Sequence, residues 1–236
     1  MALGSDNQDM SRTLYSILLI CIAALGLPAQ EVLRGEVWVD IEPIHGEYVD
    51  AVYPLDTQSV YRRALEESAM FYSAMIYGWS FDYDIGERTR GIAEVFELTP
   101  LGVIPFGDPG LFATDVQVRD MCLYLWTDYR LSAEQRRRMG IWKSGTVRTA
   151  QATGYGPLGN PVERSDWISI KKTVLEDAAR SAVRTMLRGS ERNRPKEVRG
   201  YISLSSFPKY WVESGQWAAS ARFRVEIIEI IPFAAY

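Results

Sequence analysis

The sequence predicts an α+β protein made of two tandem β-α-β-β units that follow an N-terminal signal peptide. The order of one strand, one Ala-rich helix and two further strands occurs twice, about 110 residues apart, which is longer than the roughly 20–50 residues of a solenoid repeat. Apolar residues recur every three or four positions in both helices and alternate along the strands. We therefore expect each helix to pack on a small, mainly antiparallel sheet. The expected division is a signal peptide at 1–29, units at 30–131 and 145–236, and a linker helix at 132–144.

The first unit is expected to contain a strand, a helix and two further strands, at residues 35–42, 57–77, 93–105 and 115–129. In the first strand Val37, Val39 and Ile41 alternate with polar residues, as in a half-buried strand. Gly78 marks the end of the helix. The last stretch has apolar residues at successive positions, which predicts burial on both faces of the sheet.

The second unit repeats this order at residues 145–153, 167–188, 197–205 and 216–231. Its helix has an apolar stripe that includes Leu175, Ala178 and Ala182, and Gly189 marks its end. Between the units, Ser132 and the three following residues form a capping-box pattern that begins the short linker helix.

The N-terminal segment has the features of an export signal. Residues 14–27 form an apolar run that is shorter than the about 20 residues of a membrane-spanning helix. Small residues near Ala29 place the start of the mature chain at about residues 27–31, and an uncleaved anchor is the alternative. Cys21 would be lipidated in a lipoprotein, although Ile20 is a poor residue in front of it. If Cys21 is removed, only Cys122 remains, as a small buried residue of a strand or as one half of an intermolecular disulfide.

Composition excludes some classes of function and leaves others open. The hydrophobic fraction is 47%, the charged fraction is 24% and the net charge is −4, which is typical of a globular protein and argues against a nucleic-acid partner. His45 is the single histidine, so neither a nucleophile-and-base site nor a zinc site is expected. A pair of carboxylates in a glycan hydrolase leaves little mark in sequence, so this class stays open.

Two motifs resemble ligand loops but do not fit them. Residues 154–159 match the pattern G-x-G-x-x-G, yet Pro157 and a polar stretch separate them from the next helix, so we interpret them as a strand-ending loop and expect no cofactor. Asp82, Asp84 and Glu87 give a weak calcium candidate, because the later ligand positions of a calcium loop are not filled. The alternative is an acidic turn after the first helix.

Aromatic residues in loops and at strand ends are the candidate interaction surface. The chain has seven Trp and thirteen Tyr, and large aromatic rings serve protein interfaces or stack on glycan rings. The alternative is that they belong to the core. The candidates are Trp79, Trp142, Tyr210, Trp211 and Trp217.

Residues 149–156 (TAQATGYG), residues 175–182 (LEDAARSA) and the final strands resemble the LPP20/FlgP-type envelope module and the N-terminal domain of FlgT. The resemblance covers residues 145–231, with a fainter echo in 34–129. It implies an exported, non-catalytic component of outer-membrane or flagellar assemblies, and it brings no catalytic residues. The chain departs from it in lacking a good lipobox around Cys21.

The function expected from the sequence is that of a non-enzymatic structural or assembly protein of the periplasm or outer envelope. It would act by contacts with envelope or flagellar proteins or with itself, and it could associate peripherally with the outer membrane. The alternative is a small-ligand or glycan-binding module, or a carboxylate glycan hydrolase, that uses a cleft between the two units.

Overall fold

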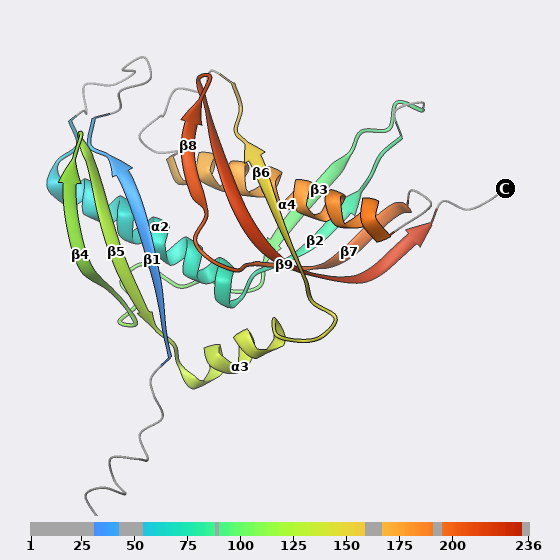
Figure 1. Ribbon diagram of the computed structural model, residues 1–236, viewed down its shortest axis with the longest axis horizontal. Coiled ribbons are helices and arrows are strands. Elements are labelled where there is room, and N and C mark those ends of the chain that lie inside the picture. The colour runs from blue at the N-terminus through green and yellow to red at the C-terminus, as the bar shows by residue number, and fades with distance from the viewer. Residues whose placement is uncertain (1–30, 43–53, 88–89, 159–166, 191–194, 233–236) are drawn as a thin grey trace, which may run out of the picture. The chain divides into compact units, whose positions relative to one another are not determined.

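The computed structural model describes residues 31–42, 54–87, 90–158, 167–190 and 195–232 (Figure 1). Residues 32–236 belong to one compact unit. The predicted signal peptide, Cys21 and His45 lie outside the described residues. The strands are β1 (Val32–Asp40), β2 (Trp79–Asp84), β3 (Val95–Pro100), β4 (Leu111–Arg119), β5 (Cys122–Arg130), β6 (Arg148–Tyr155), β7 (Pro195–Leu204), β8 (Lys209–Glu213) and β9 (Gln216–Pro232). The helices are α2 (Thr57–Ile76), α3 (Ala133–Ile141) and α4 (Trp167–Ser190).

The strands form two antiparallel sheets, which confirms the predicted α+β class. The smaller sheet has the order β1-β5-β4, and the larger has the order β3-β2-β7-β9-β6, with β8 also paired to β9. Helix α2 packs on the smaller sheet and also touches β7, whereas α4 covers β6 and β9 (Figure 1). No helix in the described ranges is long and apolar enough to cross a membrane.

The two long helices, α2 and α4, which we call the main helices, begin and end close to the predicted positions, and the short helix α3 begins where its capping box was predicted. The Asp56 carboxylate accepts a hydrogen bond from the Ser59 N–H and caps the start of α2. Gly78 follows α2 with a φ of +69°, a conformation that glycine adopts readily. At α3 both hydrogen bonds of the predicted capping box are present, between Ser132 and Gln135.

Four strands differ from the prediction. The stretch 115–129 is a hairpin rather than one strand, because Asp120 and Met121 have φ values of 51° and 56° and form the turn between β4 and β5. Only one face of β5 is buried, so the predicted burial on both faces is wrong. The segment interpreted as an acidic turn is strand β2, and β8 was not predicted.

The two halves of the sequence share the larger sheet. Strand β2, from the first half, pairs with β7 along its whole length, and β3 follows β2 at the edge of the same sheet. The predicted boundary between two units therefore separates the strands in sequence but not in space. The sequence order did predict that each helix lies on an antiparallel sheet.

Gly154, the first glycine of the G-x-G-x-x-G match, serves helix packing. A Cβ at this position would lie 2.2 Å from the Ala178 nitrogen and 2.3 Å from the Val174 oxygen, so only glycine lets α4 lie this close to β6. Asp177 accepts a hydrogen bond from the Tyr155 N–H at 2.9 Å. The two motifs on which the envelope-module resemblance depends are thus in contact with each other.

Phe207, in the link between β7 and β8, joins the two sheets. Its ring lies 5.0 Å from the Phe71 ring and 4.8 Å from the Tyr72 ring of α2. On the other side it lies over β1, where a Cβ added to Gly35 would stand 2.2 Å from the ring. Gly35 therefore makes room for the side chain that connects the larger sheet to the smaller one.

Gly35→Ala is expected to destabilise the protein by about 1–3 kcal/mol, because the methyl group overlaps the Phe207 ring and forces the two sheets apart. Urea unfolding followed by circular dichroism measures this change. Gly145→Ala is the matched control, since an added Cβ there meets nothing within 4 Å. The Phe207→Ala background should reduce the cost of Gly35→Ala, and an unchanged cost would show that the overlap is not its cause.

Candidate functional site

The smaller sheet has one face on α2 and one open face, and side chains alternate between the two. On β5, Leu125, Thr127 and Tyr129 are buried, whereas Trp126 and Asp128 are only half-buried. The Tyr72 hydroxyl of α2 donates to the Thr127 carbonyl oxygen at 2.7 Å and fixes this sheet on the helix. Helix α2 thus covers one face of β1-β5-β4, and none of the helices in the described part of the chain packs on the other face.

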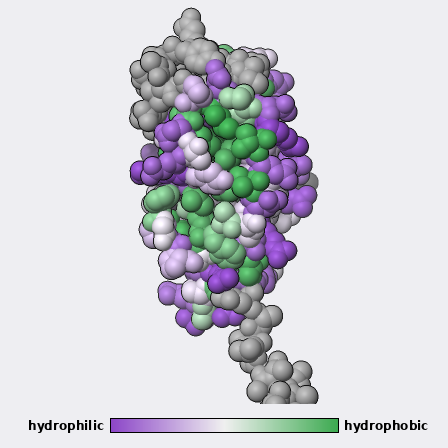
Figure 2. All heavy atoms as spheres, turned by 90° about the vertical axis from the view of Figure 1, so that its left-hand side faces the viewer, coloured by the Kyte–Doolittle hydropathy of each residue, from purple (hydrophilic) through white to green (hydrophobic). Residues whose placement is uncertain are grey.

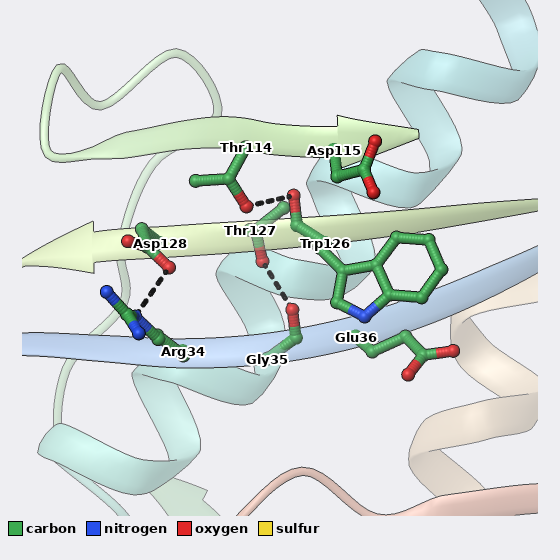
Figure 3. A pocket seen from close by; sticks show the side chains of 8 residues that line it. All are labelled: Arg34, Gly35, Glu36, Thr114, Asp115, Trp126, Thr127 and Asp128. Atoms are coloured by element: carbon green, nitrogen blue, oxygen red, sulfur yellow. Dashed lines mark hydrogen bonds and ion pairs between the residues drawn. The ribbon is translucent and has the colours of Figure 1, made fainter. Parts of the chain in front are cut away.

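The open face is hollowed around Trp126. A shallow hollow of about 530 Å³ is lined by residues of all three strands, namely Arg34, Gly35, Glu36, Thr114, Asp115, Trp126, Thr127 and Asp128. Figure 3 shows the Trp126 ring lying across the sheet, with Asp115 on one side and Glu36 on the other. Arg34 pairs with Asp128 at 3.4 Å at one end. Aromatic residues and arginine are enriched at protein interfaces, and polar residues form their rim, so this face is a candidate for protein contact.

Strand β4 is an open edge of the smaller sheet and exposes apolar side chains. Val116 and Val118 are 40% and 62% exposed, and Met121 in the following turn is 44% exposed. Figure 2 looks at the side of the protein on which β4 lies and shows hydrophobic residues gathered between hydrophilic ones. Strand β4 contains no proline, which would prevent pairing with a further strand. After a bulge at Ala113/Asp115, the strand is regular as far as Arg119.

Cys122 lies on the open face beside Asp40, in a strand as predicted. It is half-buried, and its thiol donates a hydrogen bond to Asp40 Oδ1 at 3.0 Å. Burial, together with the adjacent Asp40 carboxylate, raises the pKa of Cys122 to about 12. The thiol is therefore protonated at neutral pH and is a poor nucleophile.

The predicted aromatic surface is only partly a surface. Trp142 and Tyr210 are buried, so the prediction is wrong for them: the Trp142 indole N–H donates to the Ile76 carbonyl oxygen, and the Tyr210 hydroxyl donates to that of Lys171. Trp79, Trp211 and Trp217 are half-buried. Trp126, which was not among the candidates, is the ring that lines the open face.

The acidic residues of the calcium candidate do not converge. Asp82 lies on β2 and pairs with Arg199 of β7 at 3.0 Å. Asp84 accepts from the Gly86 N–H, and Glu87 pairs with Arg90. Across the described part of the chain, no group of three or more His, Cys, Asp or Glu side chains is placed to hold a metal ion. The alternative, an acidic turn after the first helix, is wrong for Asp82 and Asp84, because both lie in the paired strand β2.

A buried ion pair joins the two main helices. Both oxygens of Glu67 on α2 lie 2.6 Å from Lys171 Nζ on α4, and the two side chains are 2% and 6% exposed. Burial raises the pKa of Glu67, and Lys171 opposes that rise. Four rings surround the ammonium group with centroids 5.1 to 6.0 Å from Nζ, and they belong to Trp38, Trp167, Tyr210 and Trp217.

Comparison with known proteins gives a family without a named activity. A family model matches residues 23–233. The chain belongs to this family. It is similar to an uncharacterized protein of Treponema pallidum (strain Nichols), with 28% identity over 171 residues that cover 72% of this chain and 69% of the relative. No solved structure gives a significant match.

Lys171→Met is expected to lower the free energy of unfolding by about 3–5 kcal/mol, because it leaves the Glu67 carboxylate buried without a counter-charge. Chemical denaturation measures the loss. Lys172→Met, on the exposed side of the same helix, is the matched control. The double variant Glu67→Met/Lys171→Met should recover most of the loss, and a double variant as unstable as Lys171→Met would contradict this account.

Cys122 in the folded protein is expected to react with a disulfide reagent such as DTNB far more slowly than in the urea-unfolded chain at pH 8. Its folded pKa of about 12 lies well above this pH, so little thiolate forms until the pH rises much further. The absorbance of the released thiolate measures the rate. Asp40→Asn should increase the folded rate, since it removes the carboxylate that opposes ionisation, and equal rates for both folded proteins would contradict this assignment.

Proposed function

We propose that this chain is an exported, non-enzymatic assembly protein of the periplasm or outer envelope, and that it associates through strand β4 with a second copy of itself. The observation on which the proposal depends is the open β4 edge with its exposed valines. The apolar N-terminal run and the resemblance to flagellar and outer-membrane modules support the compartment and favour a flagellum-associated structure. Edge-to-edge pairing gives affinity through backbone hydrogen bonds and selectivity through the side chains.

The side chains of β4 are complementary to themselves. When two antiparallel copies pair about Gln117, Asp115 of each copy lies opposite Arg119 of the other, and Val116 lies opposite Val118. Asp115, Gln117 and Arg119 share the open face, because their partners on β5 are on that face. The two valines share the other face. Both layers of this two-fold contact therefore match, charge with opposite charge and apolar with apolar.

The free edge is protected in the single chain. Asp115 Oδ1 accepts a hydrogen bond from the Val116 N–H at 2.8 Å, so a side chain occupies a backbone donor that a second strand would otherwise use. The Arg119 guanidinium lies 4.2 Å from the Tyr124 ring. In the pair, Asp115 would turn from Val116 to Arg119 of the second copy. Asp115 gives up its hydrogen bond to Val116 only for a strand that offers an arginine opposite it. The edge therefore pairs with a matching strand in preference to unrelated strands.

A charge-swap series tests the contact. Light scattering of the chain from residue 30 onward should show a concentration-dependent dimer, and Arg119→Asp or Asp115→Arg alone should weaken dimerisation by about tenfold or more, because each places like charges opposite each other. The double variant Asp115→Arg/Arg119→Asp should restore it. Arg222→Asp, an exposed change on β9 outside this edge, is the control.

The position of the two-fold axis is tested by a disulfide. In a Cys122→Ser background, Gln117→Cys should form a covalent dimer on mild oxidation, because opposed residues on paired strands lie within disulfide reach. Thr99→Cys on β3 should not. A protein that stays monomeric at all concentrations, or a charge swap that fails to rescue, would overturn self-association through β4.

A further inference from the structure

A second, separate site lies between the two main helices. A pocket of about 240 Å³ is enclosed by α2, α4, the β2–β3 hairpin and the segment that follows β3. Its wall is mainly apolar and includes Met70, Ala74, Trp79, Leu98, Ile104 and Leu175. This volume is slightly below the about 300–1,000 Å³ of pockets for drug-sized molecules, so it suits one chain or ring.

Ser73 lines the pocket, and its buried hydroxyl group already has hydrogen-bond partners within the protein. The Ser73 hydroxyl donates to the Ala69 carbonyl oxygen at 2.6 Å and accepts from the Ile104 N–H at 2.8 Å. A ligand chain in contact with Ser73 would therefore leave the Ser73 hydroxyl with both of its hydrogen bonds. The rim is also apolar, since Val103 is 69% exposed at the mouth of the pocket. Exposed apolar groups that lead into an apolar pocket favour an apolar ligand.

Two opposite charges stand at the mouth. Lys172 and Glu176 both line the pocket, one helical turn apart on α4, and both are exposed. Within the described ranges, neither side chain forms a salt bridge. Desolvation raises the pKa of Glu176 and Lys172 only opposes this rise, so the carboxylate would gain from a further cation.

We infer that this pocket binds one apolar chain of an amphiphile that has a zwitterionic head. The chain occupies the apolar space, the head's phosphate or carboxylate contacts Lys172, and its ammonium group contacts Glu176. A purely anionic head would meet Glu176, and a purely cationic head would meet Lys172, so a head with both charges fits this mouth best. The assignment is independent of the β4 contact, which lies on the other sheet.

Binding is tested by calorimetry with four probes below their micelle-forming concentrations. Decanoyl lysophosphatidylethanolamine should bind, whereas glycerophosphoethanolamine, decanoate and decyltrimethylammonium should bind at least about tenfold more weakly, since each lacks the chain or one charge. Lys172→Gln and Glu176→Gln should each reduce binding of the first probe by about tenfold. Lys143→Gln, another exposed lysine, should not.

Vesicle sedimentation distinguishes the two sources of such a head. Binding of phosphatidylethanolamine vesicles that is lost in Lys172→Gln identifies a membrane lipid, and binding of the monoacyl probe alone identifies a free amphiphile; both support the inference. Equal binding by wild type, Lys172→Gln and Glu176→Gln would overturn it, as would equal binding of decanoate. Val103→Asp, at an exposed rim position, should also weaken binding of the monoacyl probe while the protein stays folded.

Discussion

The buried Glu67–Lys171 pair is the constraint on which the arrangement of the two halves depends. Glu67 comes from the helix of the first half and Lys171 from the helix of the second, so neither charge can be satisfied unless α2 and α4 meet in one register. Burial of two charges adds little net stability, because the cost of desolvation offsets much of their attraction. A shifted register would leave both charges unpaired, however, and this penalty selects the native arrangement. The aromatic rings around Lys171 stabilise its buried ammonium group by cation–π interactions.

This arrangement also determines which surfaces stay free. Helix α2 lies between the smaller sheet, which it holds through Tyr72, and the larger sheet, which it meets through Phe71 and Tyr210. Phe207 closes the same contact from the larger sheet. Because α2 occupies one face of β1-β5-β4, the described residues leave the face around Trp126 and the β4 edge uncovered, and these are the surfaces on which the proposed contact depends. Packing in the core and the open sheet are therefore two results of the same helix position.

The sequence predicts the local elements well and the long-range pairings poorly. Apolar periodicity, the Ser132 capping box and the Gly78 stop depend on neighbouring residues, and all are found in the structure. Strand β2 was missed because its alternation includes Asp82, whose partner Arg199 lies more than one hundred residues away. The β4–β5 turn carries Asp120 and Met121 at positive φ, without the Asn-Gly or Asp-Gly pair by which such turns are recognised.

The candidate sites show the same limit. Trp142 and Trp126 are equally aromatic in sequence, yet one is buried under α2 and the other lines the open face, since burial depends on which element covers each ring. Lys171 and Lys172 are neighbours, but the helix turns by about 100° per residue. One lysine therefore enters the core to meet Glu67, while the other stays at the mouth of the apolar pocket. One residue step along α4, about 100° of rotation, thus separates the charge that fixes the fold from the charge that we infer to contact a ligand head.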